Sequence, residues 1–419
     1  MKKQKPTLHT DSSRHSGQEK EAQPHQAQSP EQKQQRKDRV LTEGASSMVR
    51  DIGDAIVVKD QNVFFLTNPD GDVPLEGQHG LGLYYHDCRF LSGCEMKLAG
   101  ITPTALVSTA MKGFMAVFQM TNPEIRMADG GLIRKDNLGI KWERSIVGDK
   151  LLLHDLFEFQ NFGLKPVEFP ISLAFQAGFE DVFAVRGMLD ERPGKLHPPK
   201  WSNGVLTFVY EGADGLYRRV AIHFSPLPES MDGTRAEFHV TLQAKETKRL
   251  IVSLFIAEST DLDKISSQPR YQPDLERIKA ALQEDAAQWL GSHTEVRSDS
   301  LLLDNVMERS LRDLRVLRSE IENQTFFAAG VPWFATLFGR DSIITALQTL
   351  AYEPAIAEQT LRLVASYQGQ KLEPWRDEQP GKILHELRVG EMARLGEIPH
   401  TPYYGTIDAT ALFLILLGR

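Results

Sequence analysis

Apolar and polar residues alternate with a period of two through much of the chain between about residue 50 and residue 260. Alternation of this kind, broken by polar turns such as Gly148-Asp149, predicts β-strands joined as hairpins. The expected strand pairs lie at 55–68, 140–162, 204–226 and 236–259. Because no helical pattern separates these strands, they indicate an antiparallel meander packed as a large β-sandwich.

The hydrophobic period changes from 2 to 3.6 near residue 273, which predicts helices in the rest of the chain. We expect them at 273–292, 299–321, 340–352 and 354–369, with a last one starting near 407. The loop between the last two, 370–406, is long for a compact domain and rich in charged and aromatic residues. Loops of that length are usually functional or disordered, and this composition favours function.

The first 47 residues are rich in Gln, Lys, Ser and His and almost lack large apolar side chains. Such a segment buries too little surface to offset its ordering entropy, so we predict a disordered tail. The division that follows from these patterns is a tail at 1–47, a β-sandwich at 48–265, a linker helix at 266–298 and a helical domain at 299–419.

Composition argues against several classes of partner and cofactor. With a formal net charge of −8, the chain repels phosphate backbones, so nucleic acid is not an expected partner. The cysteines are Cys88 and Cys94, and we expect reduced thiols, no metal site and no cofactor, because no further Cys or His pair has ligand spacing. The N-terminus has no signal-peptide pattern, and no apolar run reaches the roughly 18 residues that a membrane span needs. We therefore expect a cytoplasmic location and no membrane partner.

Arg340 and Asp341 lie side by side in the apolar stretch 331–350. Burying charges costs several kcal/mol unless they are paired, so two interpretations are open. Asp341 can complement the start of a helix and bridge to Arg340. Alternatively, the two charges line a pocket with an aromatic wall from Trp333 and Phe338. Sugar rings favour such a site, because carboxylates and guanidinium groups hold hydroxyls while aromatic rings contact C–H patches.

Two further clusters repeat this combination at 377–391 and 399–413. The pair His385-Glu386 begins a zinc-type His-Glu-x-x-His motif, but Val389 occupies the last position and the motif fails. The first cluster could equally be a solvated charged loop, and Asp408 could be a helix cap. The recurrence of carboxylates, aromatics and arginine at helix starts within a short span of chain favours one shared site.

The segments 331–350, 368–391 and 398–417 resemble bacterial glycogen-debranching, amylo-alpha-1,6-glucosidase-like glycoside hydrolases. Segments 56–93 and 179–187 are similar to the β-sandwich that precedes the catalytic barrel of that family. The resemblance extends over about residues 50–419. It implies a large antiparallel β-sandwich followed by the first helices of an (α/α)6 six-hairpin barrel, acting on α-linked glucans or related oligosaccharides with inversion.

The resemblance also implies roles for individual residues. Arg340 and Asp341 would hold the non-reducing sugar in the first subsite, and the same pocket would be lined by His385, Glu386, Arg388, Tyr404 and Asp408. An (α/α)6 barrel needs more helices than can be read before Arg419, so the general acid and general base are expected beyond that residue. The chain would then be an inactive fragment, with an exposed apolar patch around Leu347, Leu361 and 412–417 through which it self-associates.

Two other functions remain open from sequence. The chain could be a non-catalytic carbohydrate-binding or accessory protein in which the sandwich binds sugar. It could also be an all-β interaction module with a helical appendage.

Overall fold

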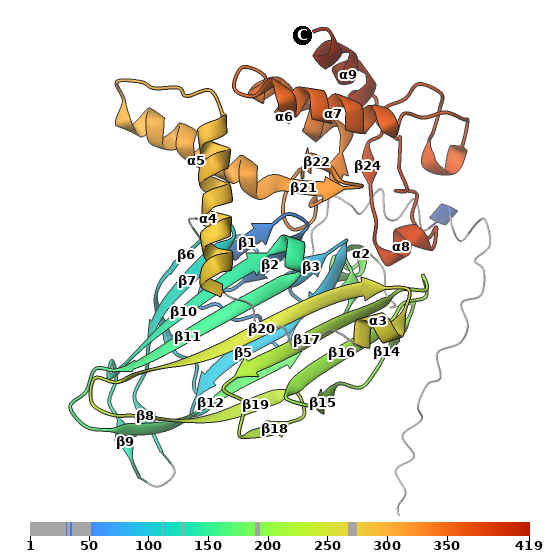
Figure 1. Cartoon of the computed structure of the whole chain (residues 1–419). Helices are drawn as coiled ribbons and strands as arrows, with labels where there is room; N and C mark the ends of the chain where they lie inside the picture. Colours follow the sequence, from blue (N-terminus) through green and yellow to red (C-terminus); the bar gives the residue numbers. More distant parts are fainter. Residues whose placement is uncertain are drawn as a thin grey trace, which may run out of the picture.

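The computed structural model describes residues 31, 34, 35, 52–110, 112–127, 130–188, 193–266 and 275–419. Within these ranges the chain forms a β-sandwich and a group of helices that lies over one end of it (Figure 1). The disordered tail expected at 1–47 falls almost entirely outside the described residues. No helix in the described ranges is both long and apolar enough to cross a membrane.

The largest sheet has the strand order β14-β16-β17-β20-β11-β10-β7-β6, with β15 also paired to β16. Its strands are β6 Thr104–Thr109, β7 Met115–Thr121, β10 Leu138–Val147, β11 Leu152–Asn161, β14 Lys195–Leu196, β15 Lys200–Ser202, β16 Val205–Glu211, β17 Tyr217–Ser225 and β20 Thr247–Ser259. A four-stranded sheet of order β18-β19-β12-β5 is built from β5 Gly93–Leu98, β12 Val167–Gln176, β18 Ser230–Asp232 and β19 Arg235–Leu242.

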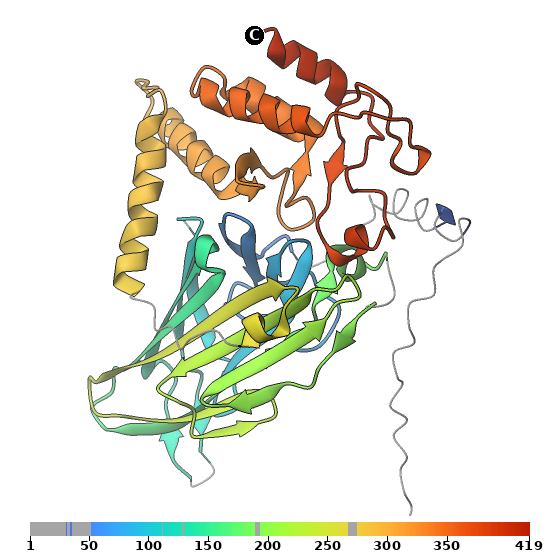
Figure 2. The same cartoon turned by 45° about the vertical axis from the view of Figure 1, so that its right-hand side comes forward.

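A five-stranded sheet of order β1-β2-β3-β4-β13 lies at the end of the sandwich that meets the helices (Figures 1 and 2). Its strands are β1 Ile56–Asp60, β2 Val63–Thr67, β3 Gly82–Tyr85, β4 Cys88–Leu91 and β13 Glu180–Asp181. The short helix α2 Val182–Val185 follows β13 directly, and β8 Ile125–Arg126 pairs with β9 Leu132–Ile133. Cys88 and Cys94 are both free and buried.

The predicted β-sandwich is confirmed, and so are most of its predicted hairpins. Strands β10 and β11 pair along their whole length around the 3-10 turn Gly148–Lys150, and β16 pairs with β17. The hairpin predicted at 236–259 is wrong, because β19 pairs with β12 while β20 lies between β11 and β17 in another sheet. A period of two indicates which face of a strand is buried but not which strand is its neighbour.

The sandwich core is dense in aromatic residues and also holds a buried ion pair between Arg144 and Asp155. Trp142 is fully buried and packs on Phe118 and Phe157, with ring centroids 5.4 Å and 4.6 Å away. The guanidinium of Arg144 lies over the Trp142 ring and is held by both carboxylate oxygens of Asp155 at 2.8 Å. A buried charge is tolerated when it is paired and hydrogen-bonded in this way.

The helices predicted beyond residue 273 are present, with one correction. The elements are α3 Leu262–Ser266, α4 Leu275–Ser292, α5 Leu301–Leu317, α6 Gly339–Thr349, α7 Pro354–Ser366, α8 Glu391–Arg394 and α9 Ala409–Leu417, with the 3-10 turn η2 Pro374–Arg376. The helix expected to reach residue 321 ends at Leu317, and Arg318–Ile321 becomes strand β21, paired with β22 Gln324–Phe327. The Nζ atom of Lys59 in β1 donates to the carbonyl of Arg318 at 2.7 Å, which ties this strand to the sandwich.

Candidate functional site

A two-residue strand pair brings two of the sequence clusters together. Strand β23 Leu337–Phe338 pairs with β24 Glu386–Leu387, so Phe338 faces Glu386 across the ladder. Helix α6 begins at the next residue, Gly339, whose N–H donates to the carbonyl of His385 at 3.0 Å. A Cβ on Gly339 would lie 2.1 Å from the carbonyl oxygen of Leu384, so only glycine allows this approach.

Arg340 and Asp341 occupy the first turn of α6, and Arg340 links this turn to the start of α9. Its guanidinium lies 3.5 Å from the Asp341 carboxylate and 3.4 Å from that of Asp408. The Thr406 hydroxyl and Arg340 both hydrogen-bond Asp408 and hold the pKa of its carboxyl below the ordinary value. Asp408 is the first residue before α9, but its side chain makes no capping bond, so its carboxylate is committed to Arg340. All three side chains are partly exposed, which leaves room for a ligand.

A second charged group surrounds Glu386. Its carboxylate accepts a hydrogen bond from Nε of Arg388 at 2.5 Å and lies 3.4 Å from Nε2 of His400. Burial, the largest single influence, raises the pKa of Glu386, but Arg388, His400 and His385 together outweigh burial and leave that pKa below the ordinary value. Burial lowers the pKa of His400 to about 4 and also lowers that of His385. At neutral pH this group therefore presents an ionised carboxylate, a cation and neutral imidazoles.

The two groups line one cavity of about 330 Å³. Its lining comprises Phe183, Arg186, Ala329, Phe334, Phe338, Arg340, Asp341, His385, Glu386, Arg388 and His400. A second, more open hollow of about 740 Å³ adjoins it and is lined by Leu372, Pro374, Asp377, Glu378, Gln379, Lys382, Gly405, Thr406, Ile407 and Asp408. Arg340 and His385 line both hollows, so they form one continuous groove.

The structure places six of the eight predicted site residues at this groove: Arg340, Asp341, His385, Glu386, Arg388 and Asp408. Trp333 lies outside the lining, because its indole is buried among residues of α2 and α8, and only its carbonyl takes part, accepting from Arg388 at 2.7 Å. Phe334, 44% exposed, provides the aromatic surface instead. Tyr404 is buried in the helical core, and its hydroxyl donates to the carbonyl of Tyr367 at 2.7 Å.

Besides Ala329 and Phe334, three more residues that sequence reasoning did not single out line the cavity. Phe183 lies in α2, Arg186 directly follows that helix, and His400 comes from the end of the long loop. Phe183 stacks on His400 with a centroid separation of 5.6 Å, and Arg186 lies 5.9 Å from the ring of Phe334. The segment 179–187 carried a family resemblance, but no local pattern could place it beside residues 200 positions later.

Of the carboxylates next to these residues, Glu378 is structural. It accepts from the backbone N–H of Gln370 at 2.9 Å and pairs with Arg376, and its side chain is almost fully buried. In the described ranges no group of three His, Cys, Asp or Glu side chains is placed to hold a metal ion.

Comparison with known families bears on the sandwich. Residues 58–253 match the family described as the N-terminal domain of (some) glycogen debranching enzymes. The sandwich is therefore similar to the N-terminal domain of glycogen debranching enzymes. The resemblance read from the sequence is thereby confirmed for this domain, and it associates the chain with a carbohydrate-active family.

Solved structures extend the likeness of fold into the helical part. A protein from the human microbiome described as a kojibiose phosphorylase aligns over 88% of this chain with a TM-score of 0.54 and 9% identity. The chain spans about half of that protein, 53% of its length.

Two further proteins align less well. A family 92 glycosyl hydrolase aligns over 76% of this chain and 48% of its own at 10% identity, and a protein from Escherichia coli K12 described as an aldose 1-epimerase aligns over 48% and 98% at 6% identity. Their TM-scores, 0.36 and 0.28, are too low to carry an argument. Comparison with curated protein sequences gave no match.

Proposed function

We propose that the groove along α6, β24 and the start of α9 is the saccharide site of a glycoside hydrolase of the glycogen-debranching type. In this proposal the chain provides the N-terminal sandwich and the first helices of an (α/α)6 barrel. Its ligand is an α-linked glucan or a related oligosaccharide. The observation that carries the proposal is the convergence of Arg340, Asp341, His385 and Glu386 on one cavity beside Phe334 and Phe338.

The chemistry of the groove suits a sugar. Ionised carboxylates accept hydrogen bonds from hydroxyls, guanidinium groups donate to ring and hydroxyl oxygens, and phenyl rings pack on C–H patches. The cavity volume also lies within the usual range for small-molecule sites. Because Arg340 is shared by both hollows, a ligand longer than one sugar ring can contact it while it extends into the open part.

The same charges disfavour catalysis by Glu386 and Asp408 themselves. An inverting glycosidase needs a protonated carboxyl to donate to the leaving oxygen, and a general acid usually has a raised pKa. The pKa values of Glu386 and Asp408 are both lowered, so these groups stay ionised and are suited to holding hydroxyls. We therefore propose that residues 1–419 bind the sugar without hydrolysing it, and that other residues supply the general acid and the general base.

Binding of panose, a glucose trisaccharide with one α-1,6 bond, tests this function by isothermal titration calorimetry. We expect the chain to bind panose and Arg340→Ala to weaken binding about 10- to 100-fold, because a charged hydrogen bond contributes about 1.5–3 kcal/mol. The matched control is Arg362→Ala, whose exposed ion pair with Glu358 lies on α7. Unchanged affinity in Arg340→Ala, or no binding by the unaltered chain, contradicts the proposal.

The same titration separates the proposal from an accessory protein whose sandwich alone binds sugar. If the sandwich alone bound sugar, Arg340→Ala would leave the panose affinity unchanged, because Arg340 belongs to the helical part.

A further inference from the structure

The sandwich contacts the saccharide site through a carboxylate that no sequence motif marked. We propose that Asp87 is a positioning residue for this site: it holds Arg388, and Arg388 in turn holds the Glu386 carboxylate at the cavity. The inference rests on the proposed function, because it assigns a structural partner to the same site.

Asp87 lies in the tight turn between β3 and β4, at the edge of the sandwich that faces the helices. Its Oδ1 accepts from Nη1 of Arg388 at 2.8 Å, and its Oδ2 accepts from the backbone N–H of Val389 at 3.0 Å. The next residue is Gly390, where a Cβ would come within 3.0 Å of the Asp87 Cβ. The carboxylate thus grips both the side chain and the backbone of the long loop.

Arg388 makes one hydrogen bond from each of its three guanidinium nitrogens. Nε donates to Glu386 at 2.5 Å, Nη1 to Asp87 at 2.8 Å and Nη2 to the carbonyl of Trp333 at 2.7 Å. Its side chain is only 2% exposed, so water cannot replace a lost partner easily. Three fixed donors in one planar group define a single orientation of the guanidinium, and this orientation fixes where the Glu386 carboxylate lies.

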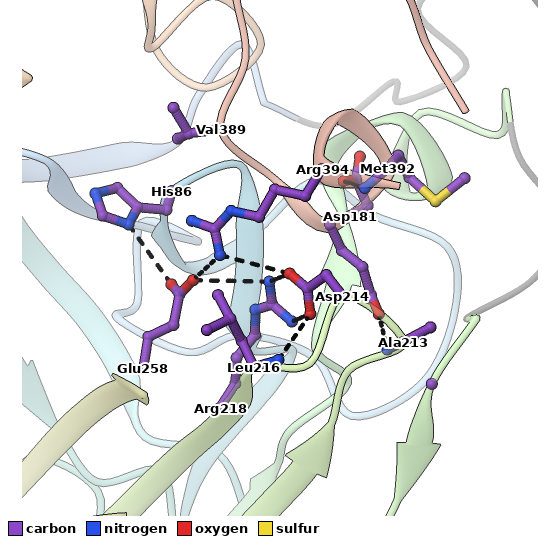
Figure 3. Close-up of polar contacts among 12 residues, drawn as sticks. His86, Asp181, Ala213, Asp214, Leu216, Arg218, Glu258, Val389, Met392 and Arg394 are labelled. Carbon is purple, nitrogen blue, oxygen red and sulfur yellow. Dashed lines mark hydrogen bonds and ion pairs between the residues drawn. The ribbon is translucent and has the colours of Figure 1, made fainter. Parts of the chain in front are cut away.

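A neighbouring set of charged residues joins the sandwich to the long loop that carries α8, but does not line the cavity. This docking cluster, shown in Figure 3, consists of His86, Asp214, Arg218, Glu258 and Arg394. Arg394 of α8 lies 2.5 Å from Glu258 and 3.4 Å from Asp214, while Arg218 pairs with Asp214 at 2.6 Å. None of these five residues lines the cavity. The cluster therefore provides a control for the loss of domain docking alone.

The experiment compares Asp87→Asn with Glu258→Gln, each of which removes one carboxylate from the interface. Panose affinity is measured by calorimetry and thermal stability by calorimetric unfolding. We expect Asp87→Asn to weaken panose binding about tenfold or more, while Glu258→Gln lowers the melting temperature but binds panose like the unaltered chain. Equal losses of affinity in the two variants overturn the inference, because Asp87 would then act only by docking the domains.

A double variant tests the route through Glu386. If Asp87 acts by positioning that carboxylate, Asp87→Asn has little further effect on panose affinity once Glu386→Gln is present. Additive losses contradict this route.

A sugar-free measurement keeps this inference separate from the proposed function. His400 lies 3.4 Å from the Glu386 carboxylate, so its imidazole NMR signal reports where that carboxylate lies. Because the charge of Asp87 also acts on His400 directly, the measurement is repeated with Glu386→Gln present. Asp87→Asn should shift the His400 signal, and clearly less once Glu386→Gln is present, whereas Glu258→Gln should not shift it. An unshifted signal in Asp87→Asn overturns the inference even if the chain binds no panose, and absence of panose binding with a shifted signal overturns only the proposed function.

Discussion

At the scale of single residues, the site is built from charges that are paired before any ligand arrives. Arg340 lies between Asp341 and Asp408, and Arg388 between Glu386 and Asp87. Paired charges avoid the large cost of an isolated buried ion, yet their remaining lone pairs and N–H groups can still bind hydroxyls. This answers why an adjacent cation and anion occur in an apolar stretch: they stand at the rim of a cavity rather than in the core.

Asp181 gives a prediction at the same scale. Burial raises the pKa of this carboxyl from its ordinary value of 3.8 to about 7 in the folded protein. Between these two values the folded state holds more protons than the unfolded state, so the free energy of unfolding falls as pH rises from about 4 to about 7. Asp181→Asn cannot ionise but keeps an oxygen that can accept from the N–H of Phe183, as Asp181 does at 3.0 Å.

Urea unfolding of the two proteins from pH 4 to pH 8 checks this expectation. The stability of Asp181→Asn relative to the unaltered chain should improve steadily as pH rises through that window. A stability difference that is independent of pH would contradict a raised pKa at Asp181.

At the scale of elements, the site depends on a junction between a strand and a helix. Strand β23, only two residues long, pairs with β24, and α6 starts immediately after it. This junction sets the four residues Arg340, Asp341, His385 and Glu386 around one cavity. Helix α8 and the turn between β3 and β4 then attach the long loop to the sandwich.

Gly339→Ala tests the junction. The added methyl group would overlap the carbonyl oxygen of Leu384, which lies 2.1 Å from the ideal Cβ position. We expect a loss of about 1–3 kcal/mol in the free energy of unfolding, as is typical of overpacking, together with weaker panose binding. Gly330→Ala is the matched control, because nothing lies within 4 Å of its ideal Cβ. The free energies of unfolding of the two variants are compared by chemical unfolding. Equal values would show that the junction is not tightly packed.

Most elements could be predicted from the sequence because their signals are local. The stripe in α5, the Pro at the start of α7 and the turn between β10 and β11 each depend on neighbouring residues. The pairing of β19 and β20 with strands in different sheets is not local, and the prediction there was wrong.

The residues of the site likewise divide into those with a local sequence signal and those without one. Arg340 and Asp408 were found because they lie next to apolar runs at helix starts, and His385 was found through the family resemblance of its segment. Asp87 was not found, because its partner Arg388 is 301 positions away and the turn that holds it resembles any other polar turn. Phe334 and Trp333 are adjacent in sequence, and only tertiary packing decides which ring faces the cavity and which is buried.

At the scale of the whole molecule, the sandwich and the helices share one site, and the helices also expose an apolar surface. Leu414 and Leu417 on α9 are 62% and 61% exposed, and Leu301 and Leu302 on α5 are 75% and 74% exposed. The apolar patch expected around Leu347 and Leu361 is smaller, because those two side chains are partly buried against the helical core.

We predict that this surface makes the chain self-associate. Light scattering after size-exclusion chromatography should show a mass that rises with concentration, and the double variant Leu414→Lys with Leu417→Lys should shift the chain toward monomer. The control is Leu164→Lys, because Leu164 is 86% exposed on the sandwich. A monomer at all concentrations, or an equal effect of the control, would contradict the prediction.

The central claim is that one cavity, formed by the start of α6 and the long loop, binds the saccharide. A crystal structure of the chain with panose tests it most directly. The account predicts a glucose ring hydrogen-bonded to Arg340 and Asp341, with Phe334 beside it and the rest of the sugar directed toward Asp408. Panose bound only to the sandwich, with no sugar atom near Arg340, would contradict the account.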